Sequence, residues 1–294
     1  MTGALRPHTR GLAVGAAVAT ATLGLAVAAV GAGGALKPAT ASVEIPDEQI
    51  AGVVAKCRKG MQVVSNGFST PSFDETFATG PSIFPIQIQP RSKRALRTRA
   101  FNFGQDAGRF RAHAYCSKRK LGLSVASRRS APVPSEFAGS RSATARCSKG
   151  SKAIAGGFRL DFGGGLVSPR LVAHVSRRAG RRGWTVAAAN DGGGPGRFEA
   201  VAICARRAPD LVARSRTRTL ASETSGAVRA SCKRGTKPFS GGFRSPVSTG
   251  DTEESSLGAF PFTSKRAGRG RWQARFFAIE GAPVRATAIA YCAR

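Results

Sequence analysis

The sequence contains few residues that could bind a metal or act as a general acid or base. It holds three histidines, and His8 lies in an N-terminal segment with the features of a leader. His113 and His174 remain, and neither has a cysteine or an acid at ligand spacing. No Cys-x-x-Cys pair occurs, and the Gly-x-Ser-x-Gly, His-Glu-x-x-His and Gly-x-x-x-x-Gly-Lys motifs are also missing. We therefore expect no metal, no cofactor and no catalytic centre.

Acidic residues are scarce too, at 16 Asp and Glu in 294 residues. Two clusters stand out, Asp74-Glu75 and Asp251-x-Glu253-Glu254. Paired carboxylates can hydrolyse a glycoside or hold calcium. Acidic pairs in polar loops mostly do neither, so we keep a glycan-processing enzyme only as a minor alternative.

Aromatic residues make up 7% of the chain. Proteins that read single-stranded nucleic acid interleave aromatic and basic residues so that bases can stack. The low content disfavours that class, and extracellular nucleic acid stays as an alternative partner. Some phenylalanines of the variable repeat middles (69–95, 159–183, 244–271) are candidate ligand contacts, with core packing as the alternative: Phe73, Phe77, Phe84, Phe260 and Phe262.

Positive charge is abundant by contrast. The chain has 46 Lys and Arg against 16 acids, a net charge of +30. Such a balance favours an anionic partner: nucleic acid, anionic glycan, teichoic-type polymer or acidic lipid. A GC-rich genome, whose codons favour Arg, Ala and Gly, would also produce this composition, so the clustering of the charges has to decide.

The N-terminal segment has the features of an export signal. Arg6, His8 and Arg10 precede an uncharged apolar stretch at 11–35. Ala39-Thr40-Ala41 then offers a small-x-small site, which predicts a signal peptide over 1–41 with cleavage before Ser42. An uncleaved membrane anchor is the alternative, because the stretch is long enough to span a bilayer. No later segment is apolar enough to do so, and we expect a secreted protein, in solution or associated with the cell envelope.

Six cysteines predict a disulfide framework in an exported chain. In chain order they form pairs 59, 57 and 60 residues apart, with gaps of 31 and 28 between pairs. This rhythm indicates three copies of one unit. The simplest pairing lies within each copy: Cys57–Cys116, Cys147–Cys204 and Cys232–Cys292. The alternative joins neighbouring copies, such as Cys116 to Cys147, and leaves Cys57 to pair with Cys292.

Shared residues support the three copies. Each copy begins with Cys-x-x-Gly, at 57–60, 147–150 and 232–235. A Gly-Phe element follows, preceded by Asn in the first copy and by Gly in the others, at 66–68, 156–158 and 241–243. Twenty residues before each second cysteine stands Leu96, Trp184 or Trp272. We place the repeats at 42–130, 131–215 and 216–294.

The secondary structure is predicted to be β throughout. The segment 286–292 alternates Ala with larger residues up to Cys292, and no stretch has a helical stripe. We expect four to six strands per unit, glycines at close backbone approaches, and further strands within the connections 117–140 and 205–225. The three tandem disulfide-closed units then form either separate sandwich-like modules or a pseudo-threefold prism.

The pattern Cys-x-x-Gly, Gly-Gly-Phe, Trp and an alternating strand into Cys resembles repeats in uncharacterised secreted proteins of high-GC Gram-positive bacteria. It resembles more distantly the vitelline membrane outer layer family, whose repeats also run from a Cys-x-x-Gly through a Gly-Phe to a closing cysteine. The residues that match in the second copy are Cys147, Gly150, Gly157, Phe158 and Cys204. The first resemblance implies no known activity. The second implies a threefold β-prism and an envelope or glycan-associated role.

Two similar basic nonapeptides occur, SRRAGRRGW at 176–184 and SKRAGRGRW at 264–272, and a shorter similar segment lies at 91–96. Each precedes the strand at Trp or Leu, which predicts a basic hairpin tip in every copy. We expect these tips to bind an anionic polymer or envelope glycan, because arginine suits phosphate and sulfate groups. The alternative is a structural or adhesion protein of the envelope whose charge is incidental. The candidate binding residues are Arg91, Lys93, Arg94, Arg177, Arg178, Arg181, Arg182, Lys265, Arg266, Arg269 and Arg271.

Overall fold

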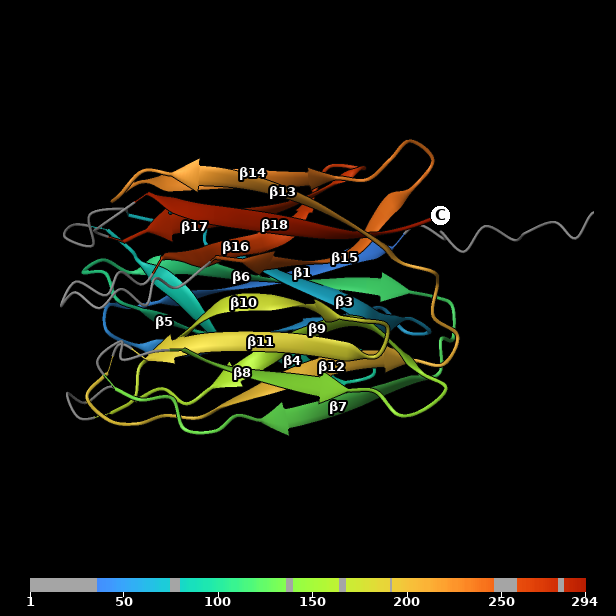
Figure 1. Cartoon of the computed structure of the whole chain (residues 1–294), viewed down its shortest axis with the longest axis horizontal. Helices are drawn as coiled ribbons and strands as arrows, with labels where there is room; N and C mark the ends of the chain where they lie inside the picture. The colour runs from blue at the N-terminus through green and yellow to red at the C-terminus, as the bar shows by residue number, and fades with distance from the viewer. Residues whose placement is uncertain are drawn as a thin grey trace, which may run out of the picture. The chain divides into compact units, whose positions relative to one another are not determined.

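The described part of the protein is all-β, with eighteen strands in three six-stranded sheets (Figure 1). The computed structural model describes residues 36–74, 80–135, 140–163, 168–190, 192–245, 258–279 and 283–294. The strands are β1 (Lys37–Ile45), β2 (Ile50–Lys56), β3 (Gln62–Ser69), β4 (Ile83–Ser92), β5 (Ala95–Asn102), β6 (Gly108–Ser117), β7 (Leu123–Arg129), β8 (Ser140–Arg146), β9 (Lys152–Leu160), β10 (Leu171–Ala179), β11 (Gly183–Asn190), β12 (Phe198–Ala205), β13 (Val212–Leu220), β14 (Ser225–Ser231), β15 (Lys237–Arg244), β16 (Ala259–Ala267), β17 (Arg271–Ala278) and β18 (Val284–Ala293).

Each repeat contributes six strands, the upper end of the expected number. The first supplies β1 to β6, the second β7 to β12 and the third β13 to β18. β7 and β13 lie in the connections where strands were predicted, and they pair with β12 and β18 along their whole lengths. β7 and β13 both begin before the predicted starts of the second and third repeats, which are residues 131 and 216.

Every sheet combines halves of two repeats. One sheet has the order β1-β6-β3-β16-β17-β14, the second β13-β18-β15-β10-β11-β8, and the third β2-β5-β4-β9-β12-β7. The joins are β3 with β16, β15 with β10, and β9 with β4. The first repeat therefore joins the third, the third joins the second, and the second joins the first. This cyclic exchange rules out independent beads and gives the pseudo-threefold arrangement.

Glycines make these joins possible. A Cβ added at Gly67 would lie 2.5 Å from the carbonyl oxygen of Ser264 on β16. The equivalent distance is 1.9 Å from Gly157 to the Ile88 oxygen and 2.3 Å from Gly242 to the Ser176 oxygen. Approaches this close leave no room for a side chain. The structural role predicted for these glycines is confirmed.

One hydrophobic core takes residues from all three sheets. The Ala face of the last strand of each repeat points inward. In the third repeat Ala286, Ala288 and Ala290 are fully buried. Phe68 and Phe243 meet edge to face, with ring centroids 6.2 Å apart. The hollow among the Gly-Phe elements of the three repeats measures about 10 Å³, the room of about one water at most. The pseudo-threefold axis is therefore packed along these elements and offers no ligand site there.

All three disulfides join cysteines of the same repeat, Cys57–Cys116, Cys147–Cys204 and Cys232–Cys292, and the pairing predicted within each copy is confirmed. The predicted signal peptide, 1–41, lies almost entirely outside the described residues. β1, however, begins at Lys37, ahead of the expected cleavage before Ser42. Among the described residues no helix is long and apolar enough to cross a membrane.

Candidate functional site

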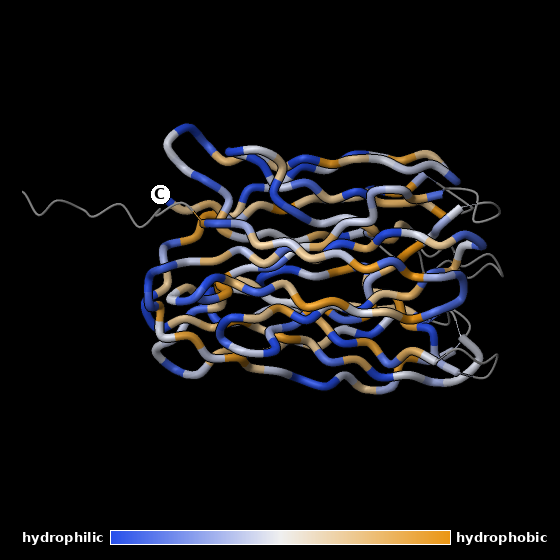
Figure 2. The backbone as a smooth tube through the Cα atoms, turned by 180° about the vertical axis from the view of Figure 1, so that it is seen from behind, coloured by the Kyte–Doolittle hydropathy of each residue, from blue (hydrophilic) through white to orange (hydrophobic). Residues whose placement is uncertain are grey.

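The three basic segments form hairpin tips, and all three lie at one end of the sheets. They connect β4 to β5, β10 to β11 and β16 to β17. Gly180 and Gly268 take positive φ values of 62° and 68° at the turns, a conformation that favours glycine. The same end holds the disulfides and the Cys-x-x-Gly turns. We call it the disulfide end. The C-terminus also lies at this end, which is on the right in Figure 1. Figure 2 shows the same end on the left, where most of its turns are hydrophilic.

Each tip is fastened to a disulfide by a backbone hydrogen bond. The N–H of Cys57 donates to the carbonyl of Arg94 at 2.8 Å, and the N–H of Cys147 donates to that of Arg182 at 2.8 Å. In the third repeat the N–H of Cys232 donates to the carbonyl of Gly270 at 2.9 Å. Because the disulfide joins this first cysteine to the last strand of the repeat, each tip is tied to the sheet through it.

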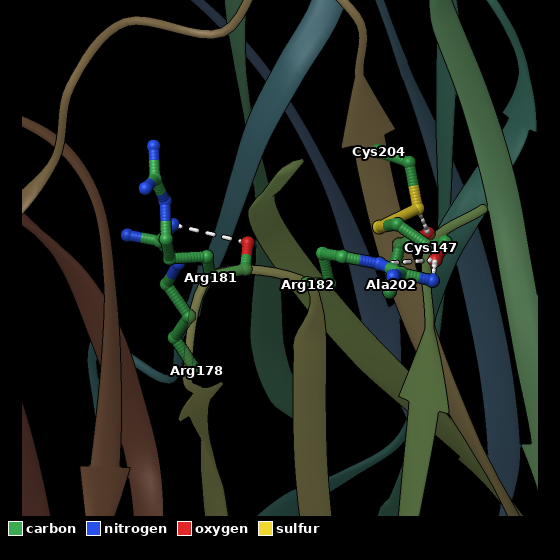
Figure 3. Close-up of a disulfide and its surroundings, with 6 residues drawn as sticks. All are labelled: Cys147, Arg178, Arg181, Arg182, Ala202 and Cys204. Atoms are coloured by element: carbon green, nitrogen blue, oxygen red, sulfur yellow. Dashed lines mark hydrogen bonds between the residues drawn. A yellow bond between two sulfur atoms is a disulfide. The ribbon is translucent and has the colours of Figure 1, made fainter. Parts of the chain in front are cut away.

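Several predicted binding residues use their guanidinium groups within the fold. Arg182 donates from Nε and Nη2 to the carbonyl of Cys147, at 3.1 and 2.9 Å (Figure 3). Arg94 donates to the carbonyl of Cys57 at 3.2 Å, and Arg178 donates to that of Arg181 at 3.1 Å. Arg266 lies over the Tyr115 ring, 5.6 Å from its centroid. These arginines position the tips as well as charging them.

Three cations of the tips are half-buried: Arg178, Lys265 and Arg266. The pKa of Lys265 is lowered, first by burial and then by the positive charges of Arg111 and Arg275. Burial also lowers the pKa of Arg178 and of Arg266. Burial is the first cause of the lowered pKa in all three residues.

The remaining predicted residues of the tips include well-exposed cations: Arg91, Lys93, Arg177, Arg181, Arg269 and Arg271. The structure adds exposed basic residues that were not predicted from the sequence. They lie in the Cys-x-x-Gly turns and in the connections that follow the second cysteines: Arg58, Lys59, Lys118, Arg119, Lys120, Lys149, Arg206, Arg207, Lys233 and Arg234. The signal was present, because Lys or Arg occupies a middle position of every Cys-x-x-Gly. The sequence alone did not place these turns beside the tips.

Acidic residues are separated from this end. The structure describes nine of the sixteen Asp and Glu residues, and eight of these lie at the opposite end, in or next to its turns: Glu44, Asp47, Glu48, Asp74, Asp106, Asp161, Glu199 and Glu223. Only Asp210 among the described acids lies at the disulfide end, where it accepts a hydrogen bond from Lys152 at 2.8 Å. The described acids are thus concentrated at one end of the strands, while basic residues occur at both ends.

The acidic clusters and phenylalanines considered from the sequence have other surroundings. The Asp74 carboxylate accepts the N–H of Gly80 at 2.7 Å, which ties its own loop. Phe84, Phe260 and Phe262 are buried in an apolar cluster, and Phe73 stacks on Phe262 at 4.1 Å. Glu75, Phe77 and the cluster at 251–254 lie outside the described residues.

Both described histidines are buried and hydrogen-bonded. His113 lies 2.9 Å from the hydroxyl of Ser69, and burial with the charges of Lys265 and Arg111 lowers its pKa to about 4. His174 contacts the carbonyl of Ser245 at 2.9 Å, and burial lowers its pKa. Within the described ranges no group of three His, Cys, Asp or Glu residues is placed to hold a metal ion.

No protein-family model matches this chain, and a search of curated proteins finds no relative. What the protein binds must therefore be inferred from the residues and geometry of the chain itself.

Proposed function

We propose that this is a secreted, non-enzymatic protein that binds an anionic polymer or cell-envelope glycan through its disulfide end. The partner is a polymer because the cations are spread over three hairpin tips and the turns between them rather than gathered in one pocket. A polymer that carries many phosphate, sulfate or carboxylate groups can contact several tips at once. After the first contact each further one is intramolecular, which raises the overall affinity. The resemblance to the vitelline membrane outer layer family points to the same envelope setting.

The near absence of described acids from the disulfide end carries the proposal, since Asp210 is the only one placed there. Codon bias raises the arginine content of a whole chain, but it does not confine the described acids to one end of the strands. A charged face with almost no acids produces a field that attracts anions. Guanidinium groups add bidentate hydrogen bonds to phosphate, sulfate and carboxylate.

The test compares polymers at two ionic strengths on the folded, oxidised protein. The probes are polyphosphate, a sulfated glycan, duplex DNA and neutral dextran. We expect the anionic glycan or polyphosphate to bind, dextran not to bind, and affinity to fall steeply as salt rises because counterions are released. DNA binding at equal or greater affinity would assign nucleic acid as the partner instead.

Matched variants locate the site. One variant replaces four exposed tip cations with Ala: Arg177, Arg181, Arg269 and Arg271. The control replaces four exposed arginines near the opposite end of the strands or along them: Arg109, Arg128, Arg218 and Arg285. Only the tip variant should weaken binding and flatten the salt dependence, by about one unit of slope for each phosphate that is no longer neutralised.

Two rival functions predict other results. An adhesion protein with incidental charge should lose binding equally in both variants, or keep its binding in high salt. An enzyme should turn over a glycan and lose that turnover on Asp251→Asn or Glu253→Gln.

A further inference from the structure

A second basic feature lies away from the disulfide end, on the outer face of the sheet β2-β5-β4-β9-β12-β7. Here a hollow of about 390 Å³ is lined by Gln87, Arg99, Arg159 and Phe162, among others. Its volume falls in the range of pockets for small organic ligands. It is not part of the proposed polymer-binding end.

The polar floor of this hollow is one row across three strands. Gln87 on β4 pairs in register with Arg99 on β5 and with Arg159 on β9. Residues paired in this way project to the same face of a sheet. The two exposed guanidinium groups therefore flank one amide, which can both donate and accept hydrogen bonds.

The walls include apolar residues, and the acids beside the row also have arginine neighbours outside it. Glu199 on β12 pairs in register with Arg159 on one side and with Arg129 on the other. Phe162 packs against Phe101 with ring centroids 4.6 Å apart, which holds its ring in place. Asp161 accepts the N–H of Arg197 at 3.1 Å and lies 3.8 Å from Nη2 of Arg129. Within the described residues, neither arginine of the row makes an ion pair or hydrogen bond with a side chain.

The other two sheets provide an internal comparison. In the first sheet Arg275 takes the place of Arg99 but lies over the Phe262 ring at 4.9 Å, and Ser69 replaces Arg159. In the second sheet Arg244 matches Arg159, while Ala187 stands where Arg99 would be. Of these three equivalent rows of described residues, only one combines two arginines with a central amide.

We propose that Arg99, Gln87 and Arg159 form a binding site for a small ring-shaped anion, one whose carboxylate or phosphate lies between the two guanidinium groups. The planar fork of arginine matches both groups. Gln87 then hydrogen-bonds a ring hydroxyl, and Phe162 contacts the apolar face of the ring. A monosaccharide that carries an acidic group has this chemistry.

Calorimetric titration of the full folded protein tests the site with glucuronate, glucose 6-phosphate and glucose. We expect at least one of the two anions to bind and glucose not to bind. Binding of glucuronate alone assigns a carboxylate, binding of glucose 6-phosphate alone assigns a phosphate, and binding of both supports the shared chemistry. Failure of both anions, or equal binding of glucose, overturns the proposal.

Variants assign the binding to the row. Arg99→Ala and Arg159→Ala should each weaken the anion by about tenfold or more, since each removes a charged hydrogen-bonding group. Arg99→Lys keeps the charge without the fork and should lie between Arg99→Ala and the wild type. Arg244→Ala, at the matched position of another sheet, and the four-residue tip variant should leave this affinity unchanged. Equal loss in Arg244→Ala would contradict the site without bearing on polymer binding at the disulfide end.

Discussion

In the second repeat the Trp184 indole packs directly against Gly156, so that a Cβ on Gly156 would lie 2.3 Å from Cγ of the indole. The third repeat has the same relationship, with 2.2 Å from Gly241 to Trp272. In the first repeat Asn66 and the smaller Leu96 stand at these positions, and the Asn66 amide donates to the carbonyl of Gly156 at 3.0 Å. A larger residue at one position thus accompanies a smaller residue at the other, as close packing of the core requires.

Gly156→Ala should therefore destabilise the protein. The added methyl group meets the Trp184 ring and the Val201 carbonyl oxygen, and overpacking of this kind costs about 1–3 kcal/mol. Denaturant unfolding measures the loss. Gly270→Ala is the control, since a Cβ there meets nothing within 4 Å. It should change stability by about 0.5 kcal/mol at most, the usual range for surface substitutions.

The double variant Gly156→Asn with Trp184→Leu copies the pair of the first repeat. Its loss of stability should be smaller than the sum of the two single losses by about 0.5 kcal/mol or more, the range for coupled neighbours. Additive losses would show that the two positions do not exchange volume.

The start of β1 predicts where the chain would begin if a signal peptide is removed. Lys37 to Ala41 pair in register with Cys116 to Ala112, and the carbonyl of Leu36 accepts a hydrogen bond from Arg266 at 3.4 Å. Cleavage before Ser42 would remove this half of the strand, so we expect any processing to occur before Leu36. Mass spectrometry of the exported protein reads the N-terminus directly.

A stability comparison checks the same point. A chain of residues 36–294 should be more stable to denaturant than a chain of residues 42–294, because the shorter one leaves part of β6 without its neighbour. A native N-terminus at Ser42 together with equal stabilities would refute this view of β1.

Much of the architecture could be predicted from local offsets. The cysteine spacing identifies the repeats and their disulfides, and the basic segments before Trp or Leu identify the hairpin tips. The exchange of strands between repeats could not be predicted, because it depends on Gln87, Val175 and Thr263, equivalent positions with unrelated residues. The uneven distribution of the acids could not be predicted for a related reason. The turns that hold most described acids alternate along the chain with the turns of the disulfide end, and only strand pairing gathers each set at one end.

Acid should destabilise the fold through His113. Its pKa is about 4 in the folded protein, below the ordinary value of 6.5, so the unfolded chain takes up the proton first. Above about pH 6.5 the imidazole is neutral in both states and its burial has no proton-linked cost. As the pH falls toward 4 the unfolded state is favoured increasingly, and the free energy of unfolding drops by about 2 kcal/mol between pH 7 and pH 5. Lys265 and Arg111 face the ring and oppose its protonation.

Denaturant unfolding at pH 7 and pH 5 measures this effect. His113→Gln should lose about 2 kcal/mol less than the wild type between the two pH values, because the proton-linked difference is gone. The burial of His174 lowers its pKa in both proteins and so cancels in this comparison. An identical loss in both proteins would show that His113 does not contribute.

Arg181 and Arg182 should separate binding from stability, although they are adjacent at one tip. Both residues are exposed, but the Arg182 side chain donates two hydrogen bonds to the carbonyl of Cys147. Arg182→Ala should lower the free energy of unfolding by about 1.5–3 kcal/mol, the usual contribution of hydrogen bonds to a charged group. Arg181→Ala should leave stability within about 0.5 kcal/mol, as expected for a surface position, while weakening the binding of the anionic polymer at low salt. If Arg181→Ala binds like the wild type and Arg182→Ala does not, the tip acts through its shape rather than through its outward charge, and the polymer must bind at the neighbouring Cys-x-x-Gly turns.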